Sequence, residues 1–326
     1  MRVLVTGGAG YIGGHTVELL RNRGDHVVVL DTLELGHKQA VGDTPLVVGN
    51  TRDTALVRSV LREHKLDAVV HFAAYKAAGE SVGNPGKYFD NNVYGTQRLL
   101  EAMREENVRH FVFSSTAALY GTPKVLPVVE SAPLRPENPY GESKLMVEQM
   151  LPWYDGAYGL RSVALRYFNA AGAVFDGHMG EDPRQAQNLV PLVMKAATGR
   201  APAIRVFGTD YPTPDGTCIR DYIHVLDLAD AHLKALDYLV ANDKSDVFNL
   251  GTGRGSSVKE VLEASCKAAG RDIPTTYVGR RAGDPVAVYA DNTKARTVLG
   301  WTPRYGLEEI VTTAWKWQSG HPDGYA

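Results

Sequence analysis

The stretch Val3–Gly13, Val-Leu-Val-Thr-Gly-Gly-Ala-Gly-Tyr-Ile-Gly, decides the fold of this chain. A short apolar run leads into Gly7, Gly10 and Gly13, and an amphipathic helix pattern follows as far as Asn22. Small residues let a backbone approach a pyrophosphate, and the first turn of a helix offers it unpaired N–H groups. The stretch therefore predicts a strand, a phosphate-binding turn and a helix. Because Gly-rich turns are common, this prediction needs support from the surrounding sequence.

The support is an acid at the end of the second predicted strand. His26–Asp31 is apolar up to its last residue, and Asp31 follows Gly13 by 18 residues. A carboxylate at this point accepts hydrogen bonds from a ribose and repels a 2′-phosphate, so the sequence predicts NAD rather than NADP. The alternative is a structural turn in which Asp31 only caps its strand.

Strand-like and helix-like segments alternate through the first half of the chain. This alternation predicts βαβ units with right-handed crossovers, and hence a doubly wound parallel sheet of the α/β class. The rhythm loosens after Ala170, so we expect a domain over residues 1–170 and a smaller α/β substrate-binding lobe over residues 171–326, with some elements returning to the first domain. The expected strands are Val3–Thr6, His26–Asp31, Leu46–Gly49, Ala68–Phe72, Phe111–Ser115, Ser162–Arg166 and Phe248–Leu250, and the expected helices are Tyr11–Asn22, Ala55–His64, Tyr88–Asn107 and Tyr140–Tyr158.

The composition argues against several classes of protein. The 326 residues carry a formal net charge of -2, so neither nucleic acid nor an anionic membrane is expected as the main partner. No stretch approaches the roughly 18 apolar residues of a membrane span, and the first residues lead into a predicted strand, so we expect a cytoplasmic protein without a signal peptide. Cys218 and Cys266 lie far apart and are expected to stay reduced. No His, Cys, Asp or Glu cluster has the spacing of metal ligands, so we expect no metal.

A Tyr and a Lys four residues apart point to proton transfer. Tyr140 and Lys144 share one face of a predicted helix, with Cβ atoms about 5–6 Å apart. An ammonium this close stabilises a phenolate, so we expect Lys144 to lower the pKa of Tyr140 from its usual value of about 10. Ser114-Ser115-Thr116 ends a predicted strand, where doubly wound sheets hold their ligands. A hydroxyl there can hydrogen-bond the phenol or a substrate oxygen.

Motifs spread along the whole chain carry a resemblance to a known family. They are Val5–Gly13, His71–Lys76, Asp90–Asn92, Pro139–Leu145, Leu165–Asn169, Arg220–His224 and Arg281–Asp284. With these residues the chain resembles the extended short-chain dehydrogenase/reductase family and, within it, the UDP-hexose 4-epimerases. The resemblance implies a Rossmann-type fold, tightly bound NAD and a UDP-hexose substrate.

The resemblance implies a catalytic role for three residues. Tyr140 is implied as the base that removes the proton of the sugar 4-hydroxyl while a hydride leaves C4 for the nicotinamide. Lys144 is implied to hold the nicotinamide ribose and to lower the pKa of the phenol. Thr116 stands where the family often has Ser, which keeps the hydroxyl but adds a methyl group and restricts χ1.

The resemblance also implies two sets of binding residues. Asn50 stands where the epimerases commonly have an Asp against the adenine amino group; its amide oxygen can accept the same hydrogen bond, and the alternative is a turn residue without a ligand role. The implied cofactor-binding residues are Gly7, Gly10, Tyr11, Ile12, Gly13, Asp31, Asn50, Thr51, Phe72, Ala73, Ala74, Lys76, Asn92, Ser114, Tyr140, Lys144 and Tyr167. The implied substrate-binding residues are Lys76, Thr116, Tyr140, Phe168, Asn169, Asn188, Leu189, Val206, Phe207, Arg220, Tyr222, Arg281, Asp284 and Val288. A homodimer paired through the helices expected at Tyr88–Asn107 and Tyr140–Tyr158 is implied as well.

Neighbouring activities differ at a few positions. Dehydratases of the same superfamily carry acids directly after the strand-end Thr, because elimination needs an acid and a base at adjacent carbons. Here Ala117 and Ala118 transfer no proton, which favours an epimerase over an NAD-dependent dehydratase, decarboxylase or reductase. A silent NAD-binding regulator is the alternative from another class, although it is expected to lack Tyr140 or Lys144. Val288 stands where some of these epimerases carry a bulky Tyr, which implies room for an N-acetyl group and activity on UDP-GlcNAc and UDP-GalNAc.

Overall fold

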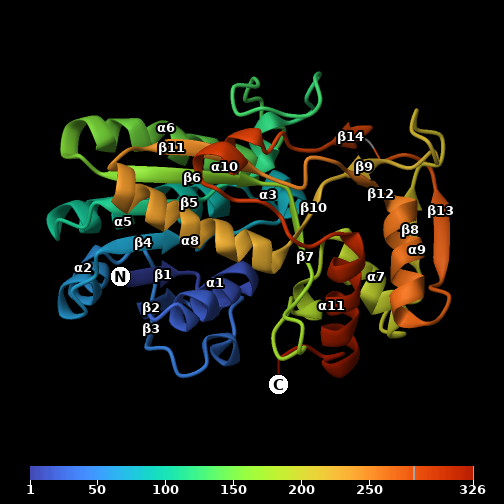
Figure 1. Cartoon of the computed structure of the whole chain (residues 1–326), viewed down its shortest axis with the longest axis horizontal. Coiled ribbons are helices and arrows are strands. Elements are labelled where there is room, and N and C mark those ends of the chain that lie inside the picture. The colour runs from blue at the N-terminus through green and yellow to red at the C-terminus, as the bar shows by residue number, and fades with distance from the viewer. Residues whose placement is uncertain (282, 326) are drawn as a thin grey trace.

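Within the residues that the computed structural model describes, 1–281 and 283–325, seven parallel strands form the central sheet, in the order β11-β6-β5-β4-β1-β2-β3 (Figure 1). They are β1 (Arg2–Thr6), β2 (His26–Asp31), β3 (Leu46–Val48), β4 (Ala68–His71), β5 (His110–Ser114), β6 (Arg161–Tyr167) and β11 (Asp246–Leu250). The strand order reverses between β1 and β4, and open α/β sheets bind their ligands at such a point. The predicted doubly wound parallel sheet is confirmed.

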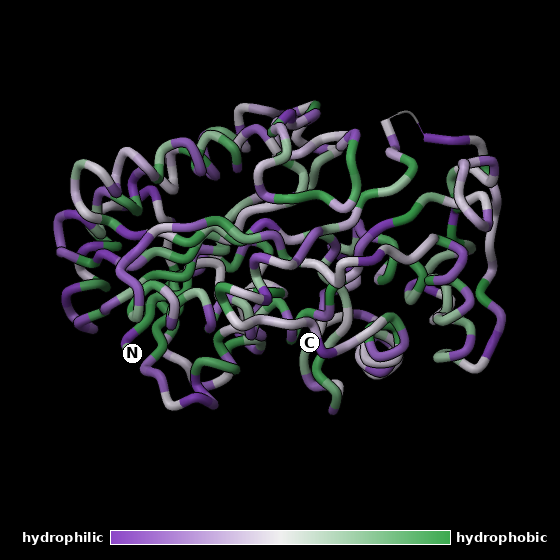
Figure 2. Tube along the Cα trace, turned by 45° about the horizontal axis from the view of Figure 1, so that its top comes forward, coloured by the Kyte–Doolittle hydropathy of each residue, from purple (hydrophilic) through white to green (hydrophobic). Residues whose placement is uncertain are grey.

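Both faces of the sheet are buried. Successive side chains of a strand point to opposite faces. In β1, Val3 and Val5 belong to one hydrophobic cluster and Leu4 belongs to another, and in β2 Val29 and Val28 are divided in the same way. Double burial explains why these strands are near-continuous apolar runs in the sequence. Figure 2 shows the runs as hydrophobic stretches side by side in the sheet.

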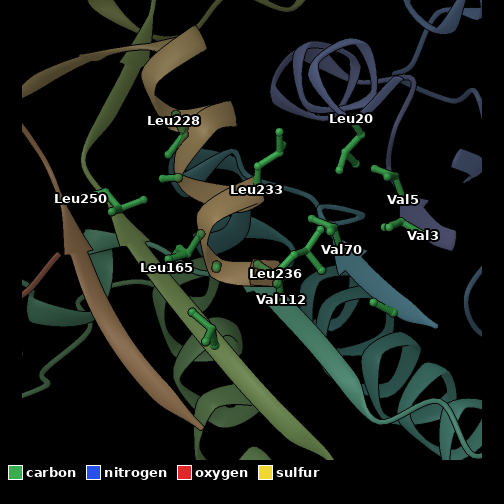
Figure 3. Packing of buried hydrophobic residues seen from close by; sticks show 14 of the residues in the cluster. Val3, Val5, Leu20, Val70, Val112, Leu165, Leu228, Leu233, Leu236 and Leu250 are labelled. Carbon is green, nitrogen blue, oxygen red and sulfur yellow. The ribbon is translucent and has the colours of Figure 1, made fainter. Parts of the chain in front are cut away.

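Helices from both halves of the chain cover the sheet. α1 packs against α8 on one face, and α2 packs against α5 on the other. Figure 3 shows Leu228 and Leu236 of α8 beside Val112 and Leu165 of the sheet. The helices are α1 (Tyr11–Asn22), α2 (Thr54–Glu63), α5 (Gly95–Glu105), α6 (Pro139–Tyr158) and α8 (Val225–Asn242). Since α8 and β11 come from the second half of the chain, that half contributes to the sheet layer. The division near residue 170 stays a prediction.

The prediction of one continuous helix over Tyr88–Asn107 is wrong. α4 (Pro85–Tyr88) and α5 (Gly95–Glu105) flank a π-helical segment, η2 (Phe89–Tyr94). Within this segment the buried side chain of Asn92 accepts a hydrogen bond from the backbone N–H of Tyr75 (2.9 Å) and donates one to Oγ of Ser143 (3.0 Å). π-helical turns are frequent at functional sites. This turn ties the loop after β4 to α6.

The second lobe lies beside the carboxyl ends of the sheet strands (Figure 1). The packed helices α7, α9 and α11 form its centre, with apolar side chains such as Val190, Val261 and Ile310 between them. Its helices are α7 (Leu189–Ala197), α9 (Val258–Ala269) and α11 (Leu307–Gly320). Its strands are β7 (Asn169–Ala171), β8 (Ile204–Phe207), β9 (Ile219–Arg220), β10 (Tyr222–His224), β12 (Ser256–Ser257), β13 (Thr275–Val278) and β14 (Ala287–Val288), which pair as β10-β7, β12-β9-β14 and β13-β8.

Short elements complete the described chain. They are η1 (Lys38–Val41), α3 (Ala78–Gly83), η3 (Ala117–Tyr120), η4 (Pro183–Gln185) and α10 (Thr293–Val298). Among the helices of residues 1–281 and 283–325, none combines the length and apolar character needed to cross a membrane.

Candidate active site

The turn between β1 and α1 leaves a helix N-terminus open to a ligand. Gly10 precedes α1, and no side chain caps the first N–H groups of this helix. These N–H groups and the helix dipole favour a phosphate. Gly13 lets the helix pack closely on the turn, because a Cβ at this position would lie 2.2 Å from the carbonyl oxygen of Gly7. The glycine motif therefore gives this turn the features of a phosphate site, as predicted from the sequence.

Asp31 lies at the end of β2 with its carboxylate buried beside this turn. One oxygen accepts a hydrogen bond from the N–H of Ala9 (3.0 Å) and the other from the N–H of Leu33 (2.9 Å). Burial raises the pKa of Asp31 above its usual value, and these backbone hydrogen bonds offset part of the rise. Each carboxylate oxygen retains a lone pair that can accept from a ribose hydroxyl. The geometry fits a dinucleotide with free ribose hydroxyls.

One cavity joins the phosphate turn to the loop after β4 and to α6. It is lined by most of the predicted cofactor-binding residues: Gly7, Gly10, Tyr11, Ile12, Gly13, Asp31, Asn50, Thr51, Phe72, Ala73, Ala74, Lys76, Tyr140, Lys144 and Tyr167. Asn92 and Ser114 lie just behind the lining. Asn92 holds the backbone of Tyr75, and Oγ of Ser114 lies 2.8 Å from the hydroxyl of Tyr167. The structure thus gathers these residues at one place, while the role of each toward a cofactor stays a prediction.

Two predicted cofactor residues have partners within the chain. The Asn50 side-chain oxygen accepts hydrogen bonds from the backbone N–H of Arg52 (2.9 Å) and from its Nε (3.2 Å), as in a side-chain-stabilised turn. The hydroxyl of Tyr11 donates to the carbonyl oxygen of Gly172 (2.6 Å) and so ties α1 to the loop after β7. Asn50 therefore has the contacts expected of a turn residue as well as a place in the cavity wall.

Tyr140 is half-buried at the start of α6, and the nearby hydroxyl of Thr116 lowers the pKa of its phenol. The hydroxyl oxygen of Thr116 accepts a bond from the N–H of Ala118 (3.1 Å) at the start of η3, which leaves the Thr116 proton free for the phenol oxygen. Burial raises the pKa of Tyr140 above its usual value, whereas the Thr116 hydrogen bond and the charge of Lys76 lower it by less. A pKa above the usual value contradicts the expectation of a lowered one, because desolvation of the phenolate outweighs the nearby donors.

Lys144 is held one helix turn after Tyr140 in an apolar setting. Its Nζ donates a hydrogen bond to the carbonyl oxygen of Ser114 (2.9 Å) and lies 4.8 Å from the ring centroid of Phe113. Burial lowers the pKa of Lys144 to about 7, although the nearby charge of Glu148 raises it. The Lys144 ammonium therefore loses its proton more readily than an exposed one, a property that the sequence spacing does not reveal.

A buried ion pair supports the floor of the site. Nη2 of Arg166 lies 2.5 Å from a carboxylate oxygen of Glu148, and both side chains are about as buried as the core. Glu148 also accepts a hydrogen bond from the hydroxyl of Ser115 (2.5 Å), directly before Thr116. Charge-assisted bonds of this kind fix geometry more firmly than neutral ones. The pair therefore ties α6 to the strand end that carries Thr116.

In the second lobe, residues predicted to bind the UDP-sugar lie close together near β9 and β14. Arg281 donates two hydrogen bonds to the carboxylate of Asp284 (3.0 and 2.7 Å), and Arg220 lies 3.6 Å from the same carboxylate. The guanidinium of Arg281 also lies over the ring of Phe207 at 5.3 Å. Val288 stands opposite Arg220 in the β14–β9 register. The structure places these residues, far apart in sequence, within one cluster.

The other predicted substrate residues lie on several elements outside this cluster. Asn169 and Tyr222 are register partners in β7 and β10, and the Asn169 amide donates to the carbonyl of Asp221 (3.0 Å). Asn188 precedes α7 without a side-chain cap bond, and Leu189 begins that helix. Phe168 follows β6, and Val206 lies in β8. These residues lie outside the lining of the dinucleotide cavity, and their substrate roles stay predictions.

Several lining residues have no counterpart in the sequence interpretation. Glu181 and Asp182 lie in the loop after β7, and Tyr325 follows α11. Nζ of Lys76 lies 3.0 Å from a carboxylate oxygen of Glu181. In the sequence, Gly180-Glu181-Asp182 has the pattern of an acidic loop. The signal that could have pointed to these lining residues was a pair of adjacent acids without an assigned role. Elsewhere in residues 1–281 and 283–325, no group of His, Cys, Asp or Glu is arranged to hold a metal ion.

Comparison with known proteins agrees with this geometry. A family model described as GDP-mannose 4,6 dehydratase matches residues 4–314. The UDP-glucose 4-epimerase of Lactobacillus helveticus is 51% identical over 327 residues, which cover 100% of this chain and 99% of that protein. The chain belongs to the UDP-glucose 4-epimerase family. The predicted resemblance is thereby confirmed.

Solved epimerase structures share the fold over the full length. The UDP-glucose 4-epimerase of Brucella ovis in complex with NAD is 48% identical, with 96% of this chain and 97% of that chain covered and a TM-score of 0.95. The enzyme of Bifidobacterium longum in complex with NAD+ and UDP is 43% identical, with 100% of both chains covered and a TM-score of 0.93. The epimerase family therefore accounts for both lobes of this chain.

Proposed function

We propose that this chain interconverts UDP-galactose and UDP-glucose reversibly, with NAD bound throughout the cycle. The observation that carries the proposal is the half-buried Tyr140 in the wall of the dinucleotide cavity, close to the hydroxyl of Thr116 and one helix turn from Lys144. The open N-terminus of α1 and the carboxylate of Asp31 suit the phosphates and a ribose of NAD. Membership of the epimerase family supports the same assignment.

The chemistry divides between cofactor and protein. NAD, held by the phosphate turn and Asp31, would supply a reversible hydride acceptor for C4 of the sugar. Tyr140 takes the proton of the 4-hydroxyl and gives it back in the second half of the cycle. Thr116 donates its hydroxyl proton to the phenol oxygen and so favours the phenolate. One base is sufficient because C4 is oxidised and then reduced while the same oxygen loses and regains its proton.

The arginines of the second lobe suit the UDP diphosphate. A guanidinium donates two parallel hydrogen bonds to a phosphate, and Arg220 and Arg281 are held near one another by the carboxylate of Asp284. Asp284 keeps the two cations in one cluster in spite of their mutual repulsion. We propose that the diphosphate binds on the open side of this pair.

The proposal is tested by incubating the purified protein, without added cofactor, with UDP-galactose and resolving the products by NMR. We expect a mixture of UDP-galactose and UDP-glucose whose final ratio is the same from either starting sugar. That result requires both epimerisation and retained NAD. A single keto, pentose or deoxy product would instead indicate a dehydratase, decarboxylase or reductase. Binding of NAD and UDP-sugar without turnover would indicate a regulator.

A dehydratase is the second candidate, because the matching family model is described as GDP-mannose 4,6 dehydratase. Elimination needs a carboxyl group near the strand-end Thr. In the structure Ala117 and Ala118 follow Thr116 and begin η3. Neither side chain transfers a proton, which supports the epimerase over the dehydratase.

Val288→Tyr is expected to remove activity on UDP-GlcNAc and UDP-GalNAc while retaining activity on UDP-galactose. We propose that Val288, in register with Arg220 at the edge of the β9–β14 pair, leaves room beside C2 of the sugar for an N-acetyl group. A Tyr ring fills that room. The measurement is kcat/KM for the plain and acetylated sugars in parallel. Equal loss on both would contradict this assignment, and Val288→Ile serves as the milder control.

We also propose that the chain forms a homodimer and works in the cytoplasm. The helices expected to pair carry large exposed apolar side chains, of which Tyr94 is 50%, Trp153 79% and Tyr158 50% exposed. Such side chains on neighbouring helices favour an interface. Sedimentation of the wild type is expected to give a dimer, and Trp153→Arg is expected to shift it toward monomer. A wild-type monomer at all concentrations would contradict the dimer.

A further inference from the structure

One wall of the dinucleotide cavity comes from outside the central sheet. Gly180, Glu181 and Asp182 follow β7, and Tyr325 follows α11. All four line the cavity together with His37 from the loop after β2. The phosphate turn and the end of β2 supply the opposite wall. A dinucleotide in this cavity is therefore enclosed between segments that are remote in sequence.

The carboxylates of this wall are paired with cations of the chain. A carboxylate oxygen of Glu181 lies 3.0 Å from Nζ of Lys76. Asp182, only 5% exposed, accepts hydrogen bonds from Nε (3.0 Å) and Nη2 (2.6 Å) of Arg184. Nε2 of His37 lies 2.7 Å from Oδ2 of Asp182, an ion-pair distance without the alignment of a hydrogen bond. An unpaired acid here would repel a diphosphate, so we assign these acids to holding the wall in place.

Tyr325 joins the wall to the loop after β2. Its ring stacks on the imidazole of His37, with ring centroids 4.7 Å apart and planes at 21°. Its hydroxyl donates a hydrogen bond to the carbonyl oxygen of Gly180 (3.0 Å). Gly324 adopts φ +81, and a Cβ there would lie 2.6 Å from Oδ1 of Asp182, so only glycine lets this segment lie against the acid. A fixed path through Gly324 thus places the ring of Tyr325 at the cavity.

A hydrogen bond from Gln185 also crosses the cavity. Nε2 of Gln185 donates a hydrogen bond to the backbone carbonyl of Leu35 (3.1 Å). Leu35 and His37 belong to the loop that begins at Asp31, the predicted ribose acceptor. The contacts of Gln185, Asp182 and Tyr325 therefore all cross the cavity at its ribose end.

We propose that Tyr325, His37 and Asp182 form a clasp that retains NAD by joining the two walls of its cavity. A dinucleotide that leaves past Asp31 must separate these contacts, so they slow its release. Retention matters to the chemistry because the hydride taken from a sugar must be returned to that sugar by the same cofactor. The inference rests on the proposed function, and its test reads cofactor exchange rather than turnover.

Tyr325→Ala and His37→Ala are each expected to speed the release of NAD by about tenfold, since each removes the same ring stack. The double variant is expected to release NAD more slowly than two independent effects would give, because the two residues share the ring stack. The measurement uses the whole chain saturated with NAD and follows replacement of bound NAD by fluorescent etheno-NAD. Tyr325→Phe keeps the stack and loses only the two hydrogen bonds between the hydroxyl and the backbone of Gly180, so we expect a smaller acceleration.

Asp323→Ala is the matched control from the same segment. Asp323 pairs with Arg200 at the surface (2.8 Å) and does not line the cavity. Its exchange rate is expected to equal that of the wild type, and thermal melts followed by circular dichroism verify that each variant is folded. Wild-type exchange rates in both Tyr325→Ala and His37→Ala would overturn the clasp, as would equal acceleration by Asp323→Ala. A wild type that neither contains nor takes up NAD would contradict the proposed function instead.

Discussion

Tyr140→Phe is expected to lower kcat by about 10²–10⁴-fold, the range that follows loss of a general acid or base. The ring stays in the cavity wall, while the hydroxyl close to Thr116 is lost. The NAD content is expected to stay unchanged, because the phosphate turn and Asp31 lie on other elements. The measurement combines kcat for UDP-galactose with quantification of released NAD.

The pH dependence of the rate, compared between the wild type and Tyr140→Phe, tests whether the titrating group is the phenol of Tyr140. Because burial raises the pKa of Tyr140, the phenolate is a minor form at neutral pH and grows as the pH rises. The wild-type rate is therefore expected to increase with pH through the neutral range, and this slope is expected to disappear in Tyr140→Phe. Tyr158→Phe, at the exposed end of the same helix, is the control and should retain wild-type kinetics. A Tyr140→Phe enzyme within about tenfold of the wild type would contradict the role of the phenol.

Lys144→Met is expected to abolish most of the activity and yet to stabilise the cofactor-stripped protein. Burial lowers the pKa of Lys144 to about 7, whereas an unfolded chain has a Lys pKa of about 10.4. Below about pH 7 both states carry the proton and the folded state bears the full cost of a buried charge. Between about pH 7 and 10.4 the unfolded state binds more protons, so this contribution to the free energy of unfolding rises with pH. The advantage of Met is thus greatest at acidic pH.

Urea unfolding at pH 6 and pH 9 checks this expectation. We expect Lys144→Met to gain about 1–4 kcal/mol at the lower pH, the range found when buried ion pairs are replaced by apolar groups, and less at the higher pH. The control is Lys267→Met, since Lys267 pairs with Glu308 at the surface and its loss is expected to change stability by less than about 1 kcal/mol. A Lys144→Met protein less stable than the wild type at pH 6 would show that the bond to Ser114 outweighs the desolvation cost.

Much of the fold was predictable because its signals are local. The strand before Gly7 and the helix after Gly10 are read within a few residues, and the structure has α1 at Tyr11–Asn22, as expected. The sheet strands are buried on both faces, so each is a recognisable apolar run. Tyr140 and Lys144 share a helix face whatever the rest of the chain does. Local periodicity therefore located two parts of the site, the glycine turn before α1 and the pair Tyr140 and Lys144 in α6.

The electrostatics of the site were not predictable from spacing. The i, i+4 pattern correctly predicts that Tyr140 and Lys144 are neighbours, but it carries no information on desolvation. Burial dominates both groups and moves the pKa of Tyr140 up and that of Lys144 down. The charge that acts on the phenol comes from Lys76, in the loop after β4. A pKa depends on everything packed around a group, and only the folded chain supplies that surrounding.

The sequence by itself determined the dinucleotide half of this protein: the glycine turn, the acid at the end of β2, the doubly wound sheet, and the Tyr and Lys of α6. The turn, the acid and the Tyr–Lys pair are each encoded within one strand or one helix turn, and the sheet follows from the alternation of strand-like and helix-like segments. The tertiary structure decided which residues close the dinucleotide cavity. Asp182 and Tyr325 meet His37 across the cavity although they lie in separate parts of the chain. No local pattern encodes such contacts, because they exist only after the second lobe has packed against the sheet.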